Sequence, residues 1–241
     1  MEAMEQFKKW LKESENIVFF GGAGISTESG IPDFRSVDGL YNQKYDYPPE
    51  TILSHSFYLR HSEEFFCFYR DKMLYLDAKP NKGHIALAKL EEMGKLKAVV
   101  TQNIDGLHQK AGSKTVYELH GSVLRNYCQR CKKFYSAEEI LNSEGIPTCE
   151  CGGRIKPDVV LYEESLNQKV MENAIRAIEC ADMLIIGGTS LSVYPAAGLI
   201  QYYRGKKLVL INKTATQMDE RAQICIQDSF GKVMEEAMKV F

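Results

Sequence analysis

The chain of 241 residues lacks both a long hydrophobic run and an excess of positive charge. No apolar stretch approaches the roughly 20 residues that a membrane-spanning helix requires. Lys and Arg total 30 against 32 Asp and Glu, a net charge of −2, which argues against a broad electrostatic surface for nucleic acid. We therefore expect no membrane span and no direct nucleic-acid partner.

The N-terminus lacks the features of a signal or transit peptide. Residues 1–10, MEAMEQFKKW, carry acidic residues and polar breaks, whereas a signal peptide has a basic start followed by an apolar core. We expect a cytoplasmic protein that acts as a monomer.

Cysteine is too sparse for a disulfide-stabilised secreted fold, because only seven are present and four of them lie in one short stretch. Cys128-x2-Cys131 is followed after seventeen residues by Cys149-x-Cys151 and two glycines. Two close pairs on short turns can put four thiolates around one tetrahedral zinc ion. Four sulfur ligands leave no open position for water, so the predicted zinc is structural; free thiols are the alternative.

The other three cysteines, Cys67, Cys180 and Cys225, stand alone in apolar or helical contexts. Free cysteine in such a context most often packs in a core. We predict that these thiols are buried and have no chemical role.

The most informative stretch is residues 16–35, NIVFFGGAGISTESGIPDFR. Residues 17–20 form a continuous apolar run that is typical of a strand covered on both faces. The glycines that follow would let the backbone approach a ligand, and Ser26 and Thr27 are cap-type residues at an expected helix start, which suits a pyrophosphate. Thr27 stands where the dinucleotide fingerprint has its third glycine, so a plain tight turn is the alternative.

Strand and helix patterns alternate along most of the chain. Besides the first strand, we predict a helix from Asn81 to Glu92 and strands at residues 97–101, 115–119, 183–186, 207–211 and 224–226. The alternation predicts an α/β fold with a mostly parallel sheet and helices on both faces.

Residues 37–80 show no strand alternation and are rich in aromatic residues. We predict a helical lobe there. Its aromatic residues could form a substrate box, but aromatic side chains at helical spacing are more often core. These residues are Phe57, Phe65, Phe66, Phe68 and Tyr69.

Polar residues and glycines stand just beyond the end of each predicted strand. Carboxyl ends of parallel strands share one edge of a sheet, so these residues are expected to converge on one crevice; ordinary polar loops are the alternative. The set comprises residues 22–27 and 102–105, His120, Gly121, Gly188, Thr189, Ser190, Asn212 and Asp228.

Several motifs, in this order, resemble one known family. They are GAGISTESGIPDFR (residues 22–35), QNID (102–105), LHG (119–121), the two cysteine pairs, KPDVVLY (156–162), GTSL (188–191) and IN (211–212). Together they resemble the sirtuins, in particular the bacterial-type NAD-dependent protein deacylases.

The resemblance implies two domains. A Rossmann-like NAD-binding domain would comprise residues 1–36, 79–122 and 158–241. A small domain would combine the helical lobe (37–78) with the zinc ribbon (123–157). NAD and acetyl-lysine would enter the cleft between them from opposite sides.

The resemblance also implies an activity: removal of acetyl groups from lysine side chains of proteins, with NAD consumed as a co-substrate and nicotinamide and O-acetyl-ADP-ribose released. His120 would be the general base, with Asn103 and Asp105 the other catalytic residues. The implied NAD contacts are Gly22, Ala23, Gly24, Thr27, Phe34, Arg35, Gln102, Asn103, Ile104, Asp105, His120, Gly188, Thr189, Ser190, Asn212 and Asp228.

The substrate peptide would lie between two strand edges, at residues 159–162 and 192–194. The implied contacts are Val160, Leu161, Tyr162 and Val193, although the valines could equally be core residues. Because such pairing uses backbone groups, weak sequence selectivity is expected.

Two other functions remain open at this point. A non-enzymatic NAD-binding or zinc-ribbon module is disfavoured by the combination of His120, Asn103 and Asp105. A mono-ADP-ribosyltransferase would use the same cleft and differ only in the nucleophile that takes the ribose.

Overall fold

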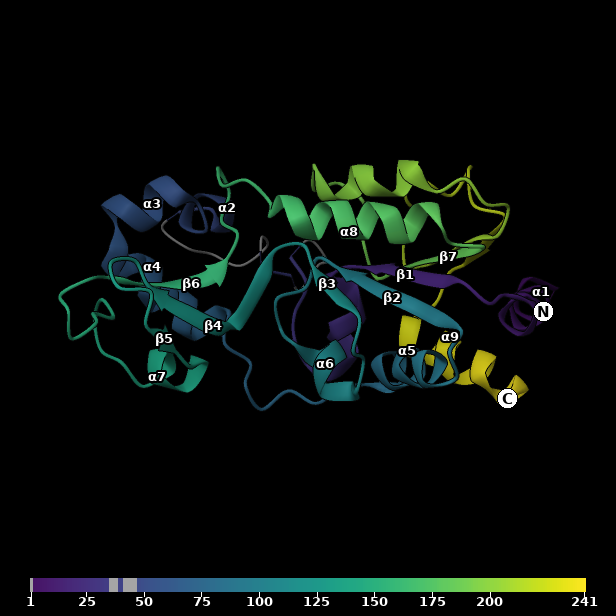
Figure 1. Cartoon of the computed structure of the whole chain (residues 1–241), viewed down its shortest axis with the longest axis horizontal. Coiled ribbons are helices and arrows are strands. Elements are labelled where there is room, and N and C mark those ends of the chain that lie inside the picture. Colours follow the sequence, from purple (N-terminus) through teal and green to yellow (C-terminus); the bar gives the residue numbers. More distant parts are fainter. Residues whose placement is uncertain (1, 35–38, 41–46) are drawn as a thin grey trace.

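The computed structural model describes residues 2–34, 39–40 and 47–241. Its elements gather into two lobes along the long axis of the molecule, and both ends of the chain lie on the larger lobe, away from the smaller one (Figure 1). The larger lobe holds a six-stranded sheet, and the smaller lobe holds a three-stranded sheet and helices α2, α3, α4 and α7.

The sheet of the larger lobe is parallel throughout, with the strand order β3-β2-β1-β7-β8-β9. In chain order this is 3-2-1-4-5-6, the order of the Rossmann fold. The strands are β1 (Ile17–Gly21), β2 (Leu96–Thr101), β3 (Val116–Glu118), β7 (Met183–Gly187), β8 (Leu208–Ile211) and β9 (Ile224–Ile226). All six predicted strands and the parallel sheet are confirmed.

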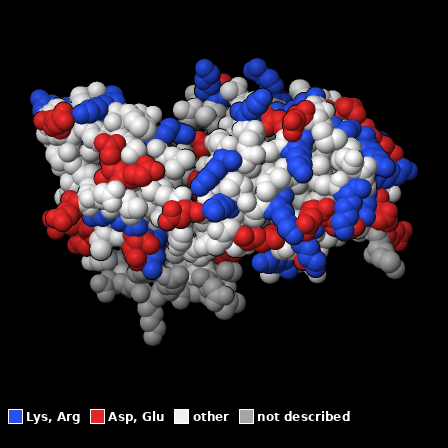
Figure 2. Space-filling model, turned by 90° about the horizontal axis from the view of Figure 1, so that it is seen from below, with Lys and Arg blue, Asp and Glu red and all other residues white. Residues whose placement is uncertain are grey.

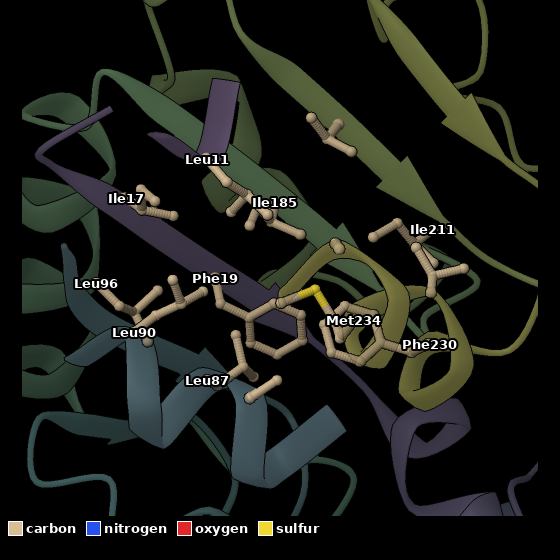
Figure 3. Packing of buried hydrophobic residues seen from close by; sticks show 14 of the residues in the cluster. Leu11, Ile17, Phe19, Leu87, Leu90, Leu96, Ile185, Ile211, Phe230 and Met234 are labelled. Carbon is tan, nitrogen blue, oxygen red and sulfur yellow. The ribbon is translucent and has the colours of Figure 1, made fainter. Parts of the chain in front are cut away.

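Helices cover both faces of this sheet, as predicted (Figure 1). The helical elements of the larger lobe are α1 (Glu2–Glu13), η1 (Ala23–Ser29), α5 (Lys82–Glu92), α6 (Leu107–Ala111), α8 (Gln168–Glu179), η3 (Ala196–Tyr202), α9 (Phe230–Ala237) and η4 (Met238–Val240). On one face, Phe19 of β1 packs among side chains of α1, α5 and α9, including Leu11, Leu87 and Phe230 (Figure 3). On the other face, Phe20 packs among side chains of α8 and η3.

Helix α5 begins and ends at the residues that the sequence indicates. The Asn81 side chain accepts a hydrogen bond from the N–H of Gly83, and the imidazole of His84 accepts one from the N–H of Asn81. These bonds satisfy donors that a helix start otherwise leaves unpaired. At the other end Gly94 has a φ of 74°, the left-handed conformation that favours glycine after a helix.

The smaller lobe combines the helical segment with the cysteine-rich segment. Its antiparallel sheet has the order β5-β4-β6. Its elements are α2 (Pro49–Ile52), α3 (His55–Arg60), α4 (Ser62–Lys72), β4 (Gly121–Cys128), β5 (Phe134–Tyr135), α7 (Ala137–Leu141) and β6 (Ile155–Val159). One hydrophobic cluster joins both segments, and all five aromatic residues predicted as core are buried in it.

The prediction that the three isolated cysteines are buried is wrong, because all three are exposed. Cys67 lies on the outer side of α4, between two pairs of buried aromatic residues. Cys180 ends α8, and Cys225 lies on β9, at the edge of the sheet.

The predicted helix start after the glycine turn also needs correction. The segment forms a 3₁₀ helix whose N-cap is Gly22, and Ser26 and Thr27 lie inside it. The hydroxyl of Thr27 donates to the carbonyl of Gly24 at 2.9 Å, and that of Ser26 bonds a distant carboxylate. Neither hydroxyl therefore caps a helix.

Within the part of the chain that the structure describes, no helix is long and apolar enough to cross a membrane. Figure 2 shows Lys and Arg interspersed with Asp and Glu over the larger lobe on the face that it presents. Among the described residues, Lys82 pairs with Glu235 and Lys232 pairs with Asp228.

We predict that Leu87→Ala lowers the free energy of unfolding by about 2–5 kcal/mol, because it opens a cavity beneath Phe19 in the core. Ile85→Ala on the same helix is the matched control, since Ile85 is 42% exposed whereas Leu87 is 0% exposed; its cost should be below about 1 kcal/mol. Urea unfolding followed by circular dichroism measures both, and equal costs would contradict the assignment of this core.

Candidate functional site

The strands of the larger sheet end at one level, which brings their following loops together. Gly21 at the end of β1 pairs with Thr101 of β2 and with Gly187 of β7. The ladder continues outward, to Glu118 at the end of β3 and to Ile211 and Ile226 at the ends of β8 and β9. The prediction that the polar loop residues share one edge of the sheet follows directly from this register.

Two glycine loops at this edge pack backbone against backbone. The N–H of Gly24 donates to the carbonyl of Gly188 at 2.8 Å. A Cβ atom on Gly24 would lie 2.9 Å from the Gly188 Cα, and one on Gly188 would lie 2.3 Å from the Ile25 nitrogen. These glycines are therefore required by the contact between the loops, a reason that the sequence analysis did not identify.

A buried serine joins the first loop to the loop after β2. The Ser26 hydroxyl donates to Oδ2 of Asp105 at 2.6 Å, and it accepts from the Asn103 amide nitrogen at 3.1 Å. The other oxygen of Asp105 accepts the N–H of Leu107 at 2.9 Å. Two of the three predicted catalytic residues thus belong to one hydrogen-bonded group.

Ser26 lies within the set of residues 22–27 that was predicted to converge on the crevice, but it was not among the implied NAD contacts, and its bond to Asp105 was not predicted. Its place in the glycine loop suggested a helix cap, and its real partner, Asp105, lies 79 residues away in the chain. No local pattern indicates a contact between residues so far apart.

The environment of Asp105 acts on its pKa in two directions. Burial raises the pKa, while the hydrogen bonds from Ser26 and Leu107 lower it, and the net shift is upward. Both hydrogen bonds stabilise the ionised form, so they offset part of the cost of burying a carboxylate.

A second hydrogen-bonded group links the loops after β2, β7 and β8. The Gln102 amide donates to the hydroxyl of Thr189 at 3.0 Å. Asn212 holds the same residue by its backbone, accepting its N–H and donating to its carbonyl, both at 3.0 Å. Thr189 and Asn212 are buried, so these contacts fix the shape of the loop.

His120 lies between the two lobes, half-buried. Its Nδ1 is 3.0 Å from the carbonyl oxygen of Gln102. Because a carbonyl only accepts, Nδ1 carries the proton and Nε2 is left as the basic nitrogen. Burial lowers the pKa of His120 even though the bond to Gln102 raises it, so the imidazole is neutral at pH 7.

The remaining predicted cofactor residues differ in their surroundings. Ala23 and Thr27 lie on η1, and the carbonyl of Ile104 accepts the N–H of Val123 at 2.9 Å. Ser190 is exposed, Phe34 packs against the core of the smaller lobe, and Asp228 forms an ion pair with Lys232 at 2.6 Å. Arg35 lies outside the described residues.

The predicted peptide segment is tied to His120 through the backbone. The N–H of Val160 donates to the His120 carbonyl at 2.9 Å, and Leu161 is buried. The backbone of Tyr162 pairs with the chain at the start of α3: its N–H donates to the carbonyl of Leu53 and its carbonyl accepts the N–H of His55, both at 3.0 Å. Val193 is half-buried on the loop before η3.

The four clustered cysteines have the geometry of a metal site. All four sulfur atoms lie within 4.8 Å of one another, and the Cys128–Cys151 and Cys131–Cys149 pairs are 3.4 and 3.6 Å apart. A tetrahedral zinc ion with Zn–S bonds of about 2.3 Å requires sulfur atoms about 3.8 Å apart, so the cluster fits. Gly153 makes room for it, since a Cβ there would lie 2.6 Å from the Cys128 sulfur.

The fold and this site define a doubly wound dinucleotide-binding protein with a four-cysteine metal module. A sequence model of the Sir2 family matches residues 22–195. The chain is 64% identical to the NAD-dependent protein deacetylase of Clostridium perfringens over 97% of both chains, and 60% identical to that of Clostridium acetobutylicum over 98% of both. This chain belongs to the Sir2 family.

Solved structures agree with this assignment. A Sir2 protein with a deacetylated p53 peptide and 3′-O-acetyl ADP ribose has a TM-score of 0.90 and 41% identity, with 98% of this chain and 97% of the other covered. A Sir2 complex with a p53 peptide and NAD+ has a TM-score of 0.87 and 42% identity at the same coverage.

We predict one zinc ion per chain, and we expect Cys128→Ala to lose it together with the fold of the smaller lobe, because removing one ligand breaks a closed site. Zinc content by mass spectrometry and the melting curve measure the loss. Cys67→Ala is the matched control, since Cys67 is exposed and outside the cluster. A zinc-free Cys128 variant that remains folded and fully active would contradict a structural zinc.

Proposed function

We propose that this chain is an NAD-dependent protein lysine deacetylase in which His120 is the general base and Asn103 and Asp105 act with it. The observation that carries the proposal is the arrangement of His120. Its Nδ1 proton is bound by the Gln102 carbonyl, which leaves Nε2 basic at the edge where six strand ends meet.

NAD, as co-substrate, supplies the reactive ribose carbon and the nicotinamide leaving group. The neutral imidazole of His120 would accept a proton from a ribose hydroxyl, and burial, which lowers the pKa of His120, keeps the ring in the unprotonated form that a general base requires. The bond to Gln102 keeps the tautomer and the ring orientation that this transfer requires.

The Ser26–Asp105–Asn103 group would bind the nicotinamide side of the cofactor. Its side chains already hydrogen-bond one another, at 2.6 and 3.1 Å. They would therefore lose little conformational freedom when NAD binds. Gly22, Gly24, Gly188 and Thr189 would surround the phosphates, and Asn212 would fix the loop that carries Thr189.

Structural zinc fits the cysteine cluster and supplies no catalysis, because four thiolates close its coordination shell. Its role would be to hold β4 and β6, which carry the segment next to His120.

The proposal extends to domains, partners and compartment. We assign residues 1–36, 79–122 and 158–241 to the NAD-binding domain, and 37–78 and 123–157 to the small domain, with boundaries that fall near the start of β4 and near the end of β6. The acetyl-lysine peptide would contact Val160, Leu161, Tyr162 and Val193. We also propose a monomer. The net charge of −2 agrees with a protein without nucleic-acid contacts, and cysteines that form no disulfide agree with the reducing cytoplasm.

We predict that incubation with NAD and an acetyl-lysine peptide releases nicotinamide, deacetylated peptide and O-acetyl-ADP-ribose in equal amounts. Mass spectrometry of all three products measures this. ADP-ribose transferred to protein without deacetylation would indicate a transferase instead. Binding of NAD without any product would indicate a non-enzymatic module.

We predict that His120→Ala lowers kcat/KM by a factor of about 10² to 10⁴, the usual contribution of a general base. NAD affinity, measured by calorimetry, should change less than about fivefold, because the base acts after the cofactor is positioned.

His61→Ala is the control for this variant, since His61 lies on the smaller lobe with a side chain that is 41% exposed. It should keep the wild-type rate. Complete loss of NAD affinity in His120→Ala would contradict the assignment of His120 as the base.

A further inference from the structure

Residues 161–164 form a tight turn that closes the predicted peptide segment. The N–H of Glu164 donates to the Leu161 carbonyl at 3.0 Å, and Glu163 has a φ of 75°. A positive φ at the third position is the mark of a type II turn, where glycine or asparagine is usual. A glutamate in this conformation requires compensating contacts.

The Glu163 side chain provides one such contact. Its Oε2 accepts the N–H of Ser56 at 2.8 Å and the Ser56 hydroxyl at 2.6 Å. Ser56 lies in the first turn of α3, whose N–H groups have no partner within the helix. The turn is therefore attached to the helical part of the smaller lobe.

The Glu164 side chain joins three elements at once. Its Oε1 lies 2.7 Å from Nδ1 of His55, at the start of α3. Its Oε2 accepts the Lys156 ammonium of β6 at 3.0 Å and the N–H of Leu161 at 2.9 Å. Lys156 also donates to the carbonyl of Val159 at 2.9 Å, so the contacts run along the whole segment.

These groups are largely shielded from solvent. The side chains of Lys156 and Glu164 are 14% and 21% exposed. Burial by itself would raise the pKa of Glu164, but the N–H of Leu161, the His55 side chain and the Lys156 ammonium together hold the pKa below the ordinary value. The carboxylate is ionised at neutral pH, and charge-assisted hydrogen bonds of this kind are the stronger ones.

The turn controls how residues 160–162 are presented. The N–H groups of these three residues already donate within the chain, to the carbonyl of His120, to the Glu164 carboxylate and to the carbonyl of Leu53. An extended peptide must therefore pair with the backbone groups of this segment that have no partner in the turn. The position of the peptide then depends on the conformation of the turn.

We infer that Glu164 is a positioning residue for the acetyl-lysine peptide: its carboxylate holds the turn against β6 and α3, and so sets the segment that receives the peptide. This inference rests on the proposed function, because that function assigns the segment to the peptide. NAD binds elsewhere in the proposal, so Glu164 acts on peptide affinity alone.

The test compares Glu164→Ala with Glu164→Gln. Alanine removes every contact of the carboxylate. Glutamine keeps one oxygen that can accept the N–H of Leu161, but it loses the charge and has an NH2 group in place of the second acceptor oxygen. We expect the Kd and KM for the acetylated peptide to rise about tenfold in Glu164→Ala, as loss of a charged hydrogen bond predicts, and to rise less in Glu164→Gln. The kcat and the Kd for NAD should stay within about twofold of wild type.

Two further variants make the result specific. Glu172→Ala removes an exposed carboxylate on α8 that accepts only from Gln168 in the described contacts, and it should change nothing. Lys156→Met removes the cation and keeps most of the packing of its stem; it should raise the peptide Kd in the same direction. Melting temperature and zinc content report whether each variant is folded.

The outcomes separate this inference from the proposed function. An unchanged peptide Kd in Glu164→Ala or Lys156→Met overturns the inference, as does an equal loss of NAD affinity or of kcat. A wild-type protein that binds acetylated peptide without releasing nicotinamide overturns the proposed function, while the peptide Kd values still decide the role of Glu164. A wild-type protein that binds no peptide overturns both.

Discussion

The register of the six parallel strands is the constraint on which the rest of the structure depends. Phe19 is buried on one face of the sheet and Phe20 on the other, so a shift of one residue would turn every side chain of β1 to the opposite face. Core packing thereby fixes the level at which β1 ends, and with it the pairing of Gly21 with Thr101 and Gly187. The position of the site therefore follows from the packing of the core, because the loops after the six strands all begin at the same edge of the sheet.

In the loops after the strand ends, side chains take the place of a neighbouring strand as hydrogen-bond partners of the backbone. Asn212 bonds both the N–H and the carbonyl of Thr189, as a neighbouring strand would do. On the other side of β1, a side-chain hydrogen bond from Ser26 to Asp105 joins the loops after β1 and β2, and Asp105 also accepts the N–H of Leu107. A buried polar group destabilises the protein when it has no partner, but the hydrogen bond that it forms with a partner is stronger than the same bond in water. The polar residues of the site thus hold the loops in shape, in addition to any contact with a ligand.

The sequence predicted the parts that depend on local pattern. Buried strands were visible as apolar runs and α5 by its Asn81 cap, and the cysteine spacing indicated the metal cluster. The convergence of Gln102, His120 and Thr189 followed from the rule for parallel sheets. What could not be predicted depends on tertiary contacts: the bond from Ser26 to Asp105, the approach of Gly24 to Gly188 and the 3₁₀ form of η1. The burial of Cys67 was predicted wrongly, because helical spacing shows two faces but not which residue at their border faces solvent.

The connection between the lobes explains why the zinc-binding lobe belongs to the site. Two residues, Leu119 and His120, join β3 of the larger sheet to β4 of the smaller one. Gly121, with a φ of 75°, begins β4 so close to β6 that a Cβ would lie 1.9 Å from the Asp158 carbonyl. Arg125 of β4 bonds Glu118 of β3 and Asp158 of β6, each at 2.8 Å. The backbone of His120 is held by β6 through Val160, and its ring by Gln102 of the larger lobe. A rotation of one lobe against the other would break one of these bonds, so the contacts that orient the lobes also orient the imidazole.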